Sequence, residues 1–88
     1  MLVYVSEYPS GLFDPPLVEQ VIPVTPDSIQ SAPFGSRTKI LRVHAAASCS
    51  ILIGRDPKAT INNGRMSRNE TEIRGVSPGD RIAVIANE

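Results

Sequence analysis

Apolar and polar residues alternate in short runs along the second half of the chain. In residues 38–45, the apolar residues Leu41, Val43 and Ala45 fall on one side of an extended strand. Residues 48–54 alternate in the same way before they reach a glycine. A period of two residues is typical of a β-strand with one buried side. The pattern therefore predicts two half-buried strands in this region.

Other segments have the composition of strands. Residues 2–8, LVYVSEY, are rich in β-branched and aromatic side chains, and Pro9 follows them. Residues 71–75 and 81–86 have a similar character, with a short extended segment near Met66 before them. No segment has the 3.6-residue period of an amphipathic helix. We therefore expect an all-β fold, a small antiparallel β-sandwich or jelly-roll-like domain.

Two turn signals separate the later strands. In Ser77-Pro78-Gly79-Asp80, proline and glycine occupy the central positions that favour a type II turn. Asn63-Gly64 is a strong hairpin signal, because both residues tolerate a positive φ. The sequence thus predicts a type II turn at residues 77–80 and a hairpin at Asn63-Gly64.

Prolines set the first part of the chain apart from the rest. Six of the eight prolines lie between residues 9 and 33, where each fixes φ and removes a backbone donor. Apolar residues lie between these prolines, so the segment is too apolar to be a free linker. We expect residues 1–36 to form a strand followed by an extended, acidic, Pro-rich arm. Residues 37–88 would form the compact β body.

Charge divides the chain at the same place. The net charge is zero, yet residues 1–36 carry four acids and no Lys or Arg, while residues 37–88 carry nine bases and five acids. Such complementarity steers and registers a contact more than it strengthens it. The arm could pack on its own body and complete a small core, or it could reach a partner subunit. The residues predicted for the partner contact are Leu12, Phe13, Leu17, Val18 and Ile22.

The small size of the chain suggests that contacts with other subunits contribute to its stability. An 88-residue chain without Trp can build only a small core. Cys49 is the single cysteine and His44 the single histidine, which excludes an internal disulfide and a four-ligand zinc site. Oligomerisation is the remaining source of added stability, so we expect a homo-oligomer. No apolar run is long enough to cross a bilayer, and no signal peptide is apparent, so we expect synthesis in a reducing cytoplasm.

The sequence offers no convincing catalytic site, metal site or cofactor site. Cys49 and His44 lie five residues apart and would face opposite sides of a continuous strand. Cys49 also shares its face with Ile51, which is typical of a buried thiol. Residues 54–60 lack the Gly-Lys-Ser/Thr that a phosphate-binding loop requires. These patterns predict a protein that is not an enzyme.

The charged residues of the second half have ordinary interpretations. Their excess is nine bases minus five acids, or four positive charges, and no aromatic residue lies among them. This does not favour nucleic-acid binding, which uses stronger basic patches and stacking rings. Glu70 and Glu72 have arginines nearby in the sequence, so we expect surface ion pairs and no catalytic carboxylate pair.

A series of short motifs runs in order through residues 38–86, which are 49 of the 88 residues. They are Arg42-Val43-His44, Cys49-Ser50-Ile51 with Ile53-Gly54, Pro57 with Ala59-Thr60, Arg65-Met66, Asn69-Glu70-Thr71-Glu72, Gly75-Val76, and Pro78-Gly79-Asp80 with Ile82-Ala83-Val84-Ile85. In order and spacing they resemble a family of small proteins encoded among the virion structural genes of tailed bacteriophages and prophages. The resemblance implies a capsid or other virion component and brings no catalytic residues. It does not cover residues 1–36.

These expectations combine into one functional prediction and one alternative. The prediction is a non-enzymatic capsid decoration or head accessory protein that binds the assembled head in multiple copies. Its partner would be the major capsid protein or another virion protein, and its location the virion. The alternative is a ligand-binding β module of a phage tail or fibre, which binds a carbohydrate or a receptor. That alternative needs an exposed aromatic platform, and the aromatics available for one are Tyr4, Tyr8, Phe13 and Phe34.

Overall fold

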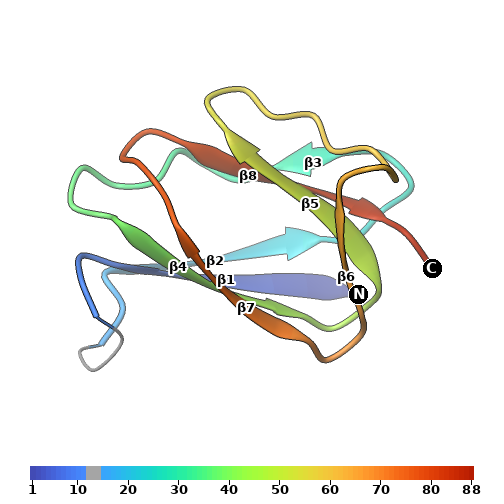
Figure 1. The fold of residues 1–88 in the computed structure, drawn as a ribbon, viewed down its shortest axis with the longest axis horizontal. Coiled ribbons are helices and arrows are strands. Elements are labelled where there is room, and N and C mark those ends of the chain that lie inside the picture. Colours follow the sequence, from blue (N-terminus) through green and yellow to red (C-terminus); the bar gives the residue numbers. More distant parts are fainter. Residues whose placement is uncertain (12–14) are drawn as a thin grey trace.

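Two four-stranded antiparallel sheets make up the fold (Figure 1). The computed structural model describes residues 1–11 and 15–88. Sheet A has the strand order β2-β1-β4-β7, and sheet B has the order β3-β8-β5-β6. The described residues include no helix, and hence none that could cross a membrane. The strands are β1 (Leu2–Tyr8), β2 (Val18–Pro23), β3 (Ile29–Gln30), β4 (Ile40–Ala45), β5 (Cys49–Gly54), β6 (Gly64–Met66), β7 (Thr71–Gly75) and β8 (Arg81–Ala86).

The two sheets enclose one hydrophobic core. In β4, Leu41, Val43 and Ala45 are fully buried, as their alternation predicted. Full burial of a leucine or valine side chain, as for Leu41 and Val43, stabilises a fold by about 1.5 to 3 kcal/mol. The prediction of an all-β fold is confirmed, and the sheets form a sandwich-like arrangement. The buried core consists of Val3, Val5, Ile22, Phe34, Leu41, Val43, Ala45, Cys49, Ile51, Met66, Ile82 and Val84.

The two turn predictions have different outcomes. Gly79 has a φ of 85°, and the Asp80 N–H donates to the Ser77 carbonyl at 3.1 Å, which confirms the type II turn. The tight hairpin at Asn63-Gly64 is wrong, because residues 55–63 lie between β5 and β6. Asn63 is not among the described residues with a positive φ. Its side-chain Oδ1 instead accepts from the Thr60 N–H at 2.7 Å, which forms a different local turn.

The structure differs from the expectation of an extended N-terminal arm. β1 lies inside sheet A, where it pairs with β2 on one side and with β4 on the other. β2 and β3 are edge strands, one in each sheet. An edge position suits β2, because Pro23 has no N–H to donate to a further strand. Ile22, from the segment expected to be an arm, belongs to the core, as the alternative that the arm packs on its own body predicted, and Val3 and Val5 of β1 lie in the same core.

Glu7 is fully buried and joins three segments of the N-terminal half. Its carboxylate accepts from the Gly35 N–H at 2.9 Å and from the Thr38 hydroxyl at 2.7 Å. Gln20 Nε2 donates to the other carboxylate oxygen at 3.0 Å. A buried acid is tolerated only when hydrogen bonds replace its hydration, and here three donors do so. Glu7 therefore fixes β2 and the loop before β4 against β1.

Candidate functional site

The only cysteine and the only histidine are not brought together. Cys49 lies in the core on β5 of sheet B, and burial raises the pKa of its thiol. His44 lies on β4 of sheet A, where its Nδ1 is 2.8 Å from the hydroxyl of Thr71. A nucleophilic thiol needs a base within hydrogen-bond reach and a lowered pKa. Cys49 has neither, so the prediction that it is a core residue is confirmed.

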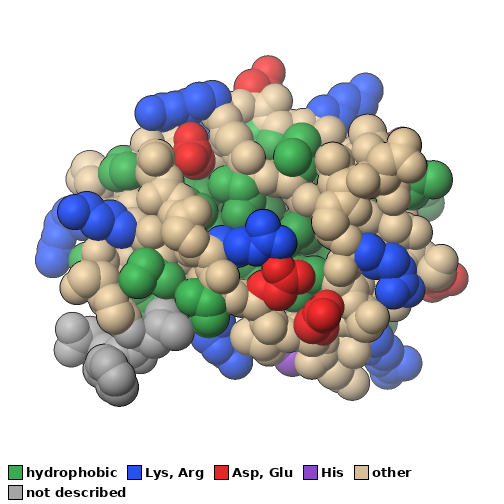
Figure 2. Space-filling model, in the orientation of Figure 1, with side chains coloured by type: hydrophobic (Ala, Val, Ile, Leu, Met, Phe, Trp, Pro, Cys, Tyr) green, Lys and Arg blue, Asp and Glu red, His purple; other side chains and the backbone are tan. Residues whose placement is uncertain are grey.

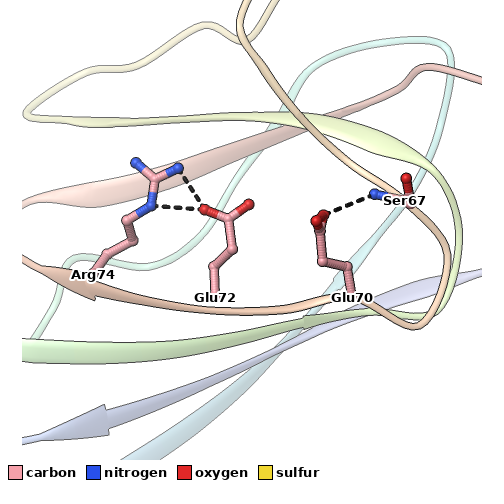
Figure 3. Close-up of polar contacts among 4 residues, drawn as sticks. All are labelled: Ser67, Glu70, Glu72 and Arg74. Atoms are coloured by element: carbon pink, nitrogen blue, oxygen red, sulfur yellow. Dashed lines mark hydrogen bonds and ion pairs between the residues drawn. The ribbon is translucent and has the colours of Figure 1, made fainter.

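The side of the sandwich at β6 and β7 carries an ion pair. Arg74 donates to Glu72 Oε1 from Nη2 at 2.6 Å and from Nε at 2.9 Å. Figure 3 shows both side chains pointing away from their own sheet, and the Arg74 guanidinium reaches Gly64 of β6. In Figure 2, basic and acidic side chains lie together here in front of hydrophobic ones. Charged side chains that point inward from an edge strand also discourage another strand from adding there.

Glu70 has a structural role next to this pair. Its Oε2 accepts from the Ser67 N–H at 3.1 Å, while its own N–H donates to the Ser67 carbonyl at 3.0 Å (Figure 3). The turn between them holds Asn69 at a φ of 68°, a conformation that asparagine tolerates better than most residues. The expected surface ion pairing is therefore confirmed for Glu72, whereas Glu70 caps a turn.

Neither a metal-binding cluster nor a pocket is present in the part of the chain that the structure describes. Residues 1–11 and 15–88 contain no group of three or more His, Cys, Asp or Glu side chains that could hold a metal ion. No pocket is found among the same residues.

The outer face of sheet A is the most distinctive surface of the molecule. The strand register places its side chains in rows that run across β2, β1, β4 and β7. One row holds Val21, Tyr4, His44 and Thr71, and the next row holds Glu19, Ser6, Arg42 and Ile73. We call this surface the sheet A face. It comprises Leu2, Tyr4, Ser6, Glu19, Val21, Arg42, His44, Thr71 and Ile73.

Large apolar side chains on the sheet A face are exposed to solvent. The exposed fraction is 45% for Tyr4, 53% for Val21 and 50% for Ile73. The ring of Tyr4 lies 6.5 Å from that of His44, centroid to centroid. Tyr4 and Val21 are direct cross-strand neighbours, whereas Ile73 lies on β7, on the far side of β4. Adjacent exposed apolar residues such as Tyr4 and Val21 commonly mark a contact surface on a small protein. This face is therefore the candidate functional site.

Two opposite charges stand within the same row of this face. Glu19 on β2 and Arg42 on β4 are separated by Ser6 on β1. The Ser6 hydroxyl donates to Glu19 Oε1 at 3.2 Å. Neither charged side chain forms an ion pair with another described residue. The face thus combines an apolar surface with one acidic and one basic group at fixed positions.

Part of the outer face of sheet B is covered by the chain itself, although Leu52 on that face is 37% exposed. Ser50 and Ala83 point away from the core yet are fully buried. Figure 1 shows residues 55–63, in yellow after β5, passing over the side of sheet B that faces away from sheet A. The Ala59 N–H donates to the Ser28 hydroxyl at 2.8 Å, which ties this segment down. Asn87 Nδ2 bonds both the Ser50 hydroxyl at 2.8 Å and the Ile61 carbonyl at 3.1 Å.

The residues predicted for a partner contact are distributed over several environments. Leu12 and Phe13 lie outside the described residues. Leu17 and Val18 are exposed where the β1–β2 connection enters β2. Ile22 is 3% exposed and belongs to the core, so it is already occupied within the chain.

The sequence interpretation missed the sheet A face. Tyr4 and Val21 lie in segments whose apolar residues were assigned to a strand and to an arm, without regard to their sides. A signal was present in residues 2–8, where apolar side chains occupy both sides of the strand. Such a strand is either buried on both sides or exposes an apolar side.

Comparisons of this chain with models of protein families, with characterised proteins and with solved structures find no match. The fold and the surface described above are therefore the observations from which a function is inferred.

Proposed function

We propose that this protein is a non-enzymatic structural subunit of a tailed-phage particle, a capsid decoration or head accessory protein. It acts through protein–protein contacts, and the sheet A face is its main contact surface. The partners are copies of itself and the major capsid protein or another virion protein. Because many copies would bind to the repeated subunits of the head, contacts that are weak individually would together give stable attachment.

The observation that carries this proposal is the exposed, apolar sheet A face. Tyr4, Val21 and Ile73 stay about half exposed, whereas Ser50 and Ala83 on the outer side of the other sheet are buried under the chain itself. Binding surfaces of this kind need rigid support, and the hydrogen-bonded sheet provides it. The motifs of residues 38–86 add the resemblance to virion proteins, and they include the charged row residue Arg42.

The strand order lends further support. The orders β2-β1-β4-β7 and β3-β8-β5-β6 correspond to the two sheets of an eight-stranded jelly roll in which the usual last strand comes first. Consistent with such a permutation, the Met1 carbonyl accepts from the Val24 N–H, and the Ala86 N–H donates to the Thr25 carbonyl. Both chain ends therefore lie beside residues 24–25. Jelly rolls occur in viral capsid proteins and in lectins, so an analogy of fold fits both candidate functions. The surface of the protein has to distinguish between them.

The alternative, a carbohydrate- or receptor-binding module, has one observation in its favour. Tyr4 exposes an aromatic ring beside His44, as a sugar-binding surface would. However, Tyr8 and Phe34 are buried, and Phe13 lies outside the described residues. A single exposed ring makes a poor platform, so we favour the structural role.

The test is the composition of purified particles from a phage or induced prophage whose genome encodes this chain. Heads and tails would be separated and their proteins quantified by mass spectrometry. We expect multiple copies in the head fraction. Absence from both fractions would overturn the proposal, and presence in tails alone would favour the ligand-binding alternative.

A matched pair of variants tests the contact surface. Tyr4→Ser should reduce the number of copies per head, because it removes an exposed ring from the sheet A face. Leu52→Ser is the control, since Leu52 is the exposed large apolar residue on the outer side of sheet B. Equal loss with both variants would argue against the sheet A face.

A further inference from the structure

The sheet A face has charges that match a second copy of the same face. Glu19 on β2 and Arg42 on β4 lie in one row, at equal distances on either side of β1. A two-fold axis that lies in the interface along β1 exchanges these two positions. Each Glu19 then stands opposite Arg42 of the second copy, and each Arg42 stands opposite Glu19. Two ion pairs form from one repeated contact.

We propose that the sheet A face is an isologous dimer interface whose occupant is a second copy of this chain. This inference rests on the proposed function, in which that face is the contact surface, and it names the partner.

The same axis also brings matching apolar side chains together. Tyr4 and Leu2 lie on β1 itself, so each would meet the same residue of the second copy near the axis. Val21 would lie opposite His44 of the second copy. Aligned sheets pack about 10 Å apart, a distance that tyrosine, glutamate and arginine side chains from both sides can span. Tyrosine pairs add to such contacts beyond their buried area.

The charge balance of the face favours this occupant over others. A nucleic acid or an acidic membrane surface would need a predominance of positive charge. The face carries Arg42 and Glu19 in balance, and a buried charge is tolerated only when it finds its opposite. A two-fold dimer satisfies both charges at once and closes, since each copy uses the face once.

Addition of a strand at the edge of β2 is a weaker alternative. β2 has no neighbour on its outer side in sheet A, and a second β2 could pair there. Pro23 has no N–H to donate to such a pair, and the exposed side chains of the sheet A face would remain in solvent. A dimer through the sheet A face would bury exposed side chains that a dimer through the edge of β2 would leave in solvent.

Charge exchange tests the interface directly. The mass of the full chain would be measured by sedimentation velocity over a dilution series, with a β-type circular dichroism spectrum required of every variant. Wild type should reach twice 9.5 kDa. Glu19→Arg and Arg42→Glu should each weaken the dimer by roughly 10- to 100-fold, because like charges then face each other. The double variant Glu19→Arg/Arg42→Glu should restore the dimer.

Two further variants make the outcome decisive. Tyr4→Ser should also weaken the dimer, and it does not depend on charge. Asp27→Arg/Lys39→Glu exchanges two exposed charges that lie outside the sheet A face and should leave the wild-type mass. A monomeric wild type at all concentrations, or a dimer that ignores Glu19→Arg, Arg42→Glu and Tyr4→Ser, would overturn the inference. A dimer that never occurs in particles would instead overturn the proposed function.

Discussion

The outer faces of the two sheets differ in what covers them. On sheet B, Ser50 and Ala83 point outward yet are fully buried, because residues 55–63 and Asn87 lie over them. On sheet A, Tyr4 and Val21 point outward and are about half exposed. The contrast is not complete, because Leu52 on the outer side of sheet B is 37% exposed and Tyr8 on the outer side of sheet A is buried.

This difference suggests where the protein meets other molecules. Where the chain itself covers the outer face of a sheet, the apolar side chains on that face are already buried when the monomer folds. A sheet that exposes an aromatic and two aliphatic side chains gains more stability when something binds to it. The inward-pointing Glu72 and Arg74 on the edge strand β7 oppose addition of a strand at that edge. This obstacle at β7 leaves the edge of β2 and the sheet A face as the two places where sheet A could bind another molecule, and we propose the face.

The largest expected effect comes from removing the N-terminal segment of sheet A. Deletion of residues 1–36 would take away β1, which lies between β2 and β4, together with the edge strands β2 and β3. Core residues Val3 and Val5 would be lost as well. We expect no cooperative thermal unfolding by circular dichroism. A deletion variant that still unfolds cooperatively would mean that residues 37–88 are the folding unit.

The inner and outer sides of sheet A should respond very differently to the loss of an acid. Glu7→Ala leaves the Gly35 N–H and the Thr38 hydroxyl without their acceptor. It should lower the free energy of unfolding by about 3 kcal/mol. Glu19→Ala is the control on the outer side and should change the monomer by less than about 0.5 kcal/mol. Urea denaturation measures both, and equal effects would contradict the placement of Glu7.

Residues 55–63, which lie over sheet B, should open more often when the hydrogen bonds that hold them are removed. Ser28→Ala removes the acceptor of the Ala59 N–H, and Asn87→Ala removes the bonds to Ser50 and Ile61. Each should cost about 1 kcal/mol. Faster hydrogen exchange in residues 55–63, with unchanged exchange in β4, would support the assignment. Faster exchange spread evenly over both sheets would count against a local cover.

The smallest expected effect is a pH dependence that originates in the core. Because burial raises the pKa of the Cys49 thiol, the unfolded chain loses this proton at a lower pH than the folded chain. The contribution to stability is complete below the pKa of the unfolded chain and is lost as pH rises through the folded value. The unfolding free energy of wild type should therefore fall more steeply at alkaline pH than that of Cys49→Ala. Parallel curves would indicate that the thiol is accessible in the folded state.

The sequence contained most of the strands but not the relation between their faces. The alternation in residues 38–45, and Pro78 with Gly79, predicted β4 and a type II turn that the structure contains. These features depend on neighbours along the chain, which a single sequence displays.

The differences come from contacts between distant residues. Whether β1 lies in the middle of a sheet depends on its pairing with β2 and β4. Whether an outer face is covered depends on bonds such as Ser28 to Ala59, across 31 residues. Alternation shows which side chains share a face, but it does not show what lies over that face. The apolar residues on both sides of residues 2–8 were therefore a signal for the sheet A face, but only the folded chain shows that one of these sides is exposed.

The most direct test of this account is the two-dimensional ¹H–¹⁵N NMR spectrum of the full chain, recorded over a dilution series. Dissociation should change the chemical shifts of residues on and beside the sheet A face, such as Tyr4, Val21 and Arg42. Residues under the cover of sheet B, such as Ser50 and Ala83, should keep their positions. Shifts confined to sheet B, or no concentration dependence in either sheet, would contradict the claim that the uncovered face of sheet A binds a second copy.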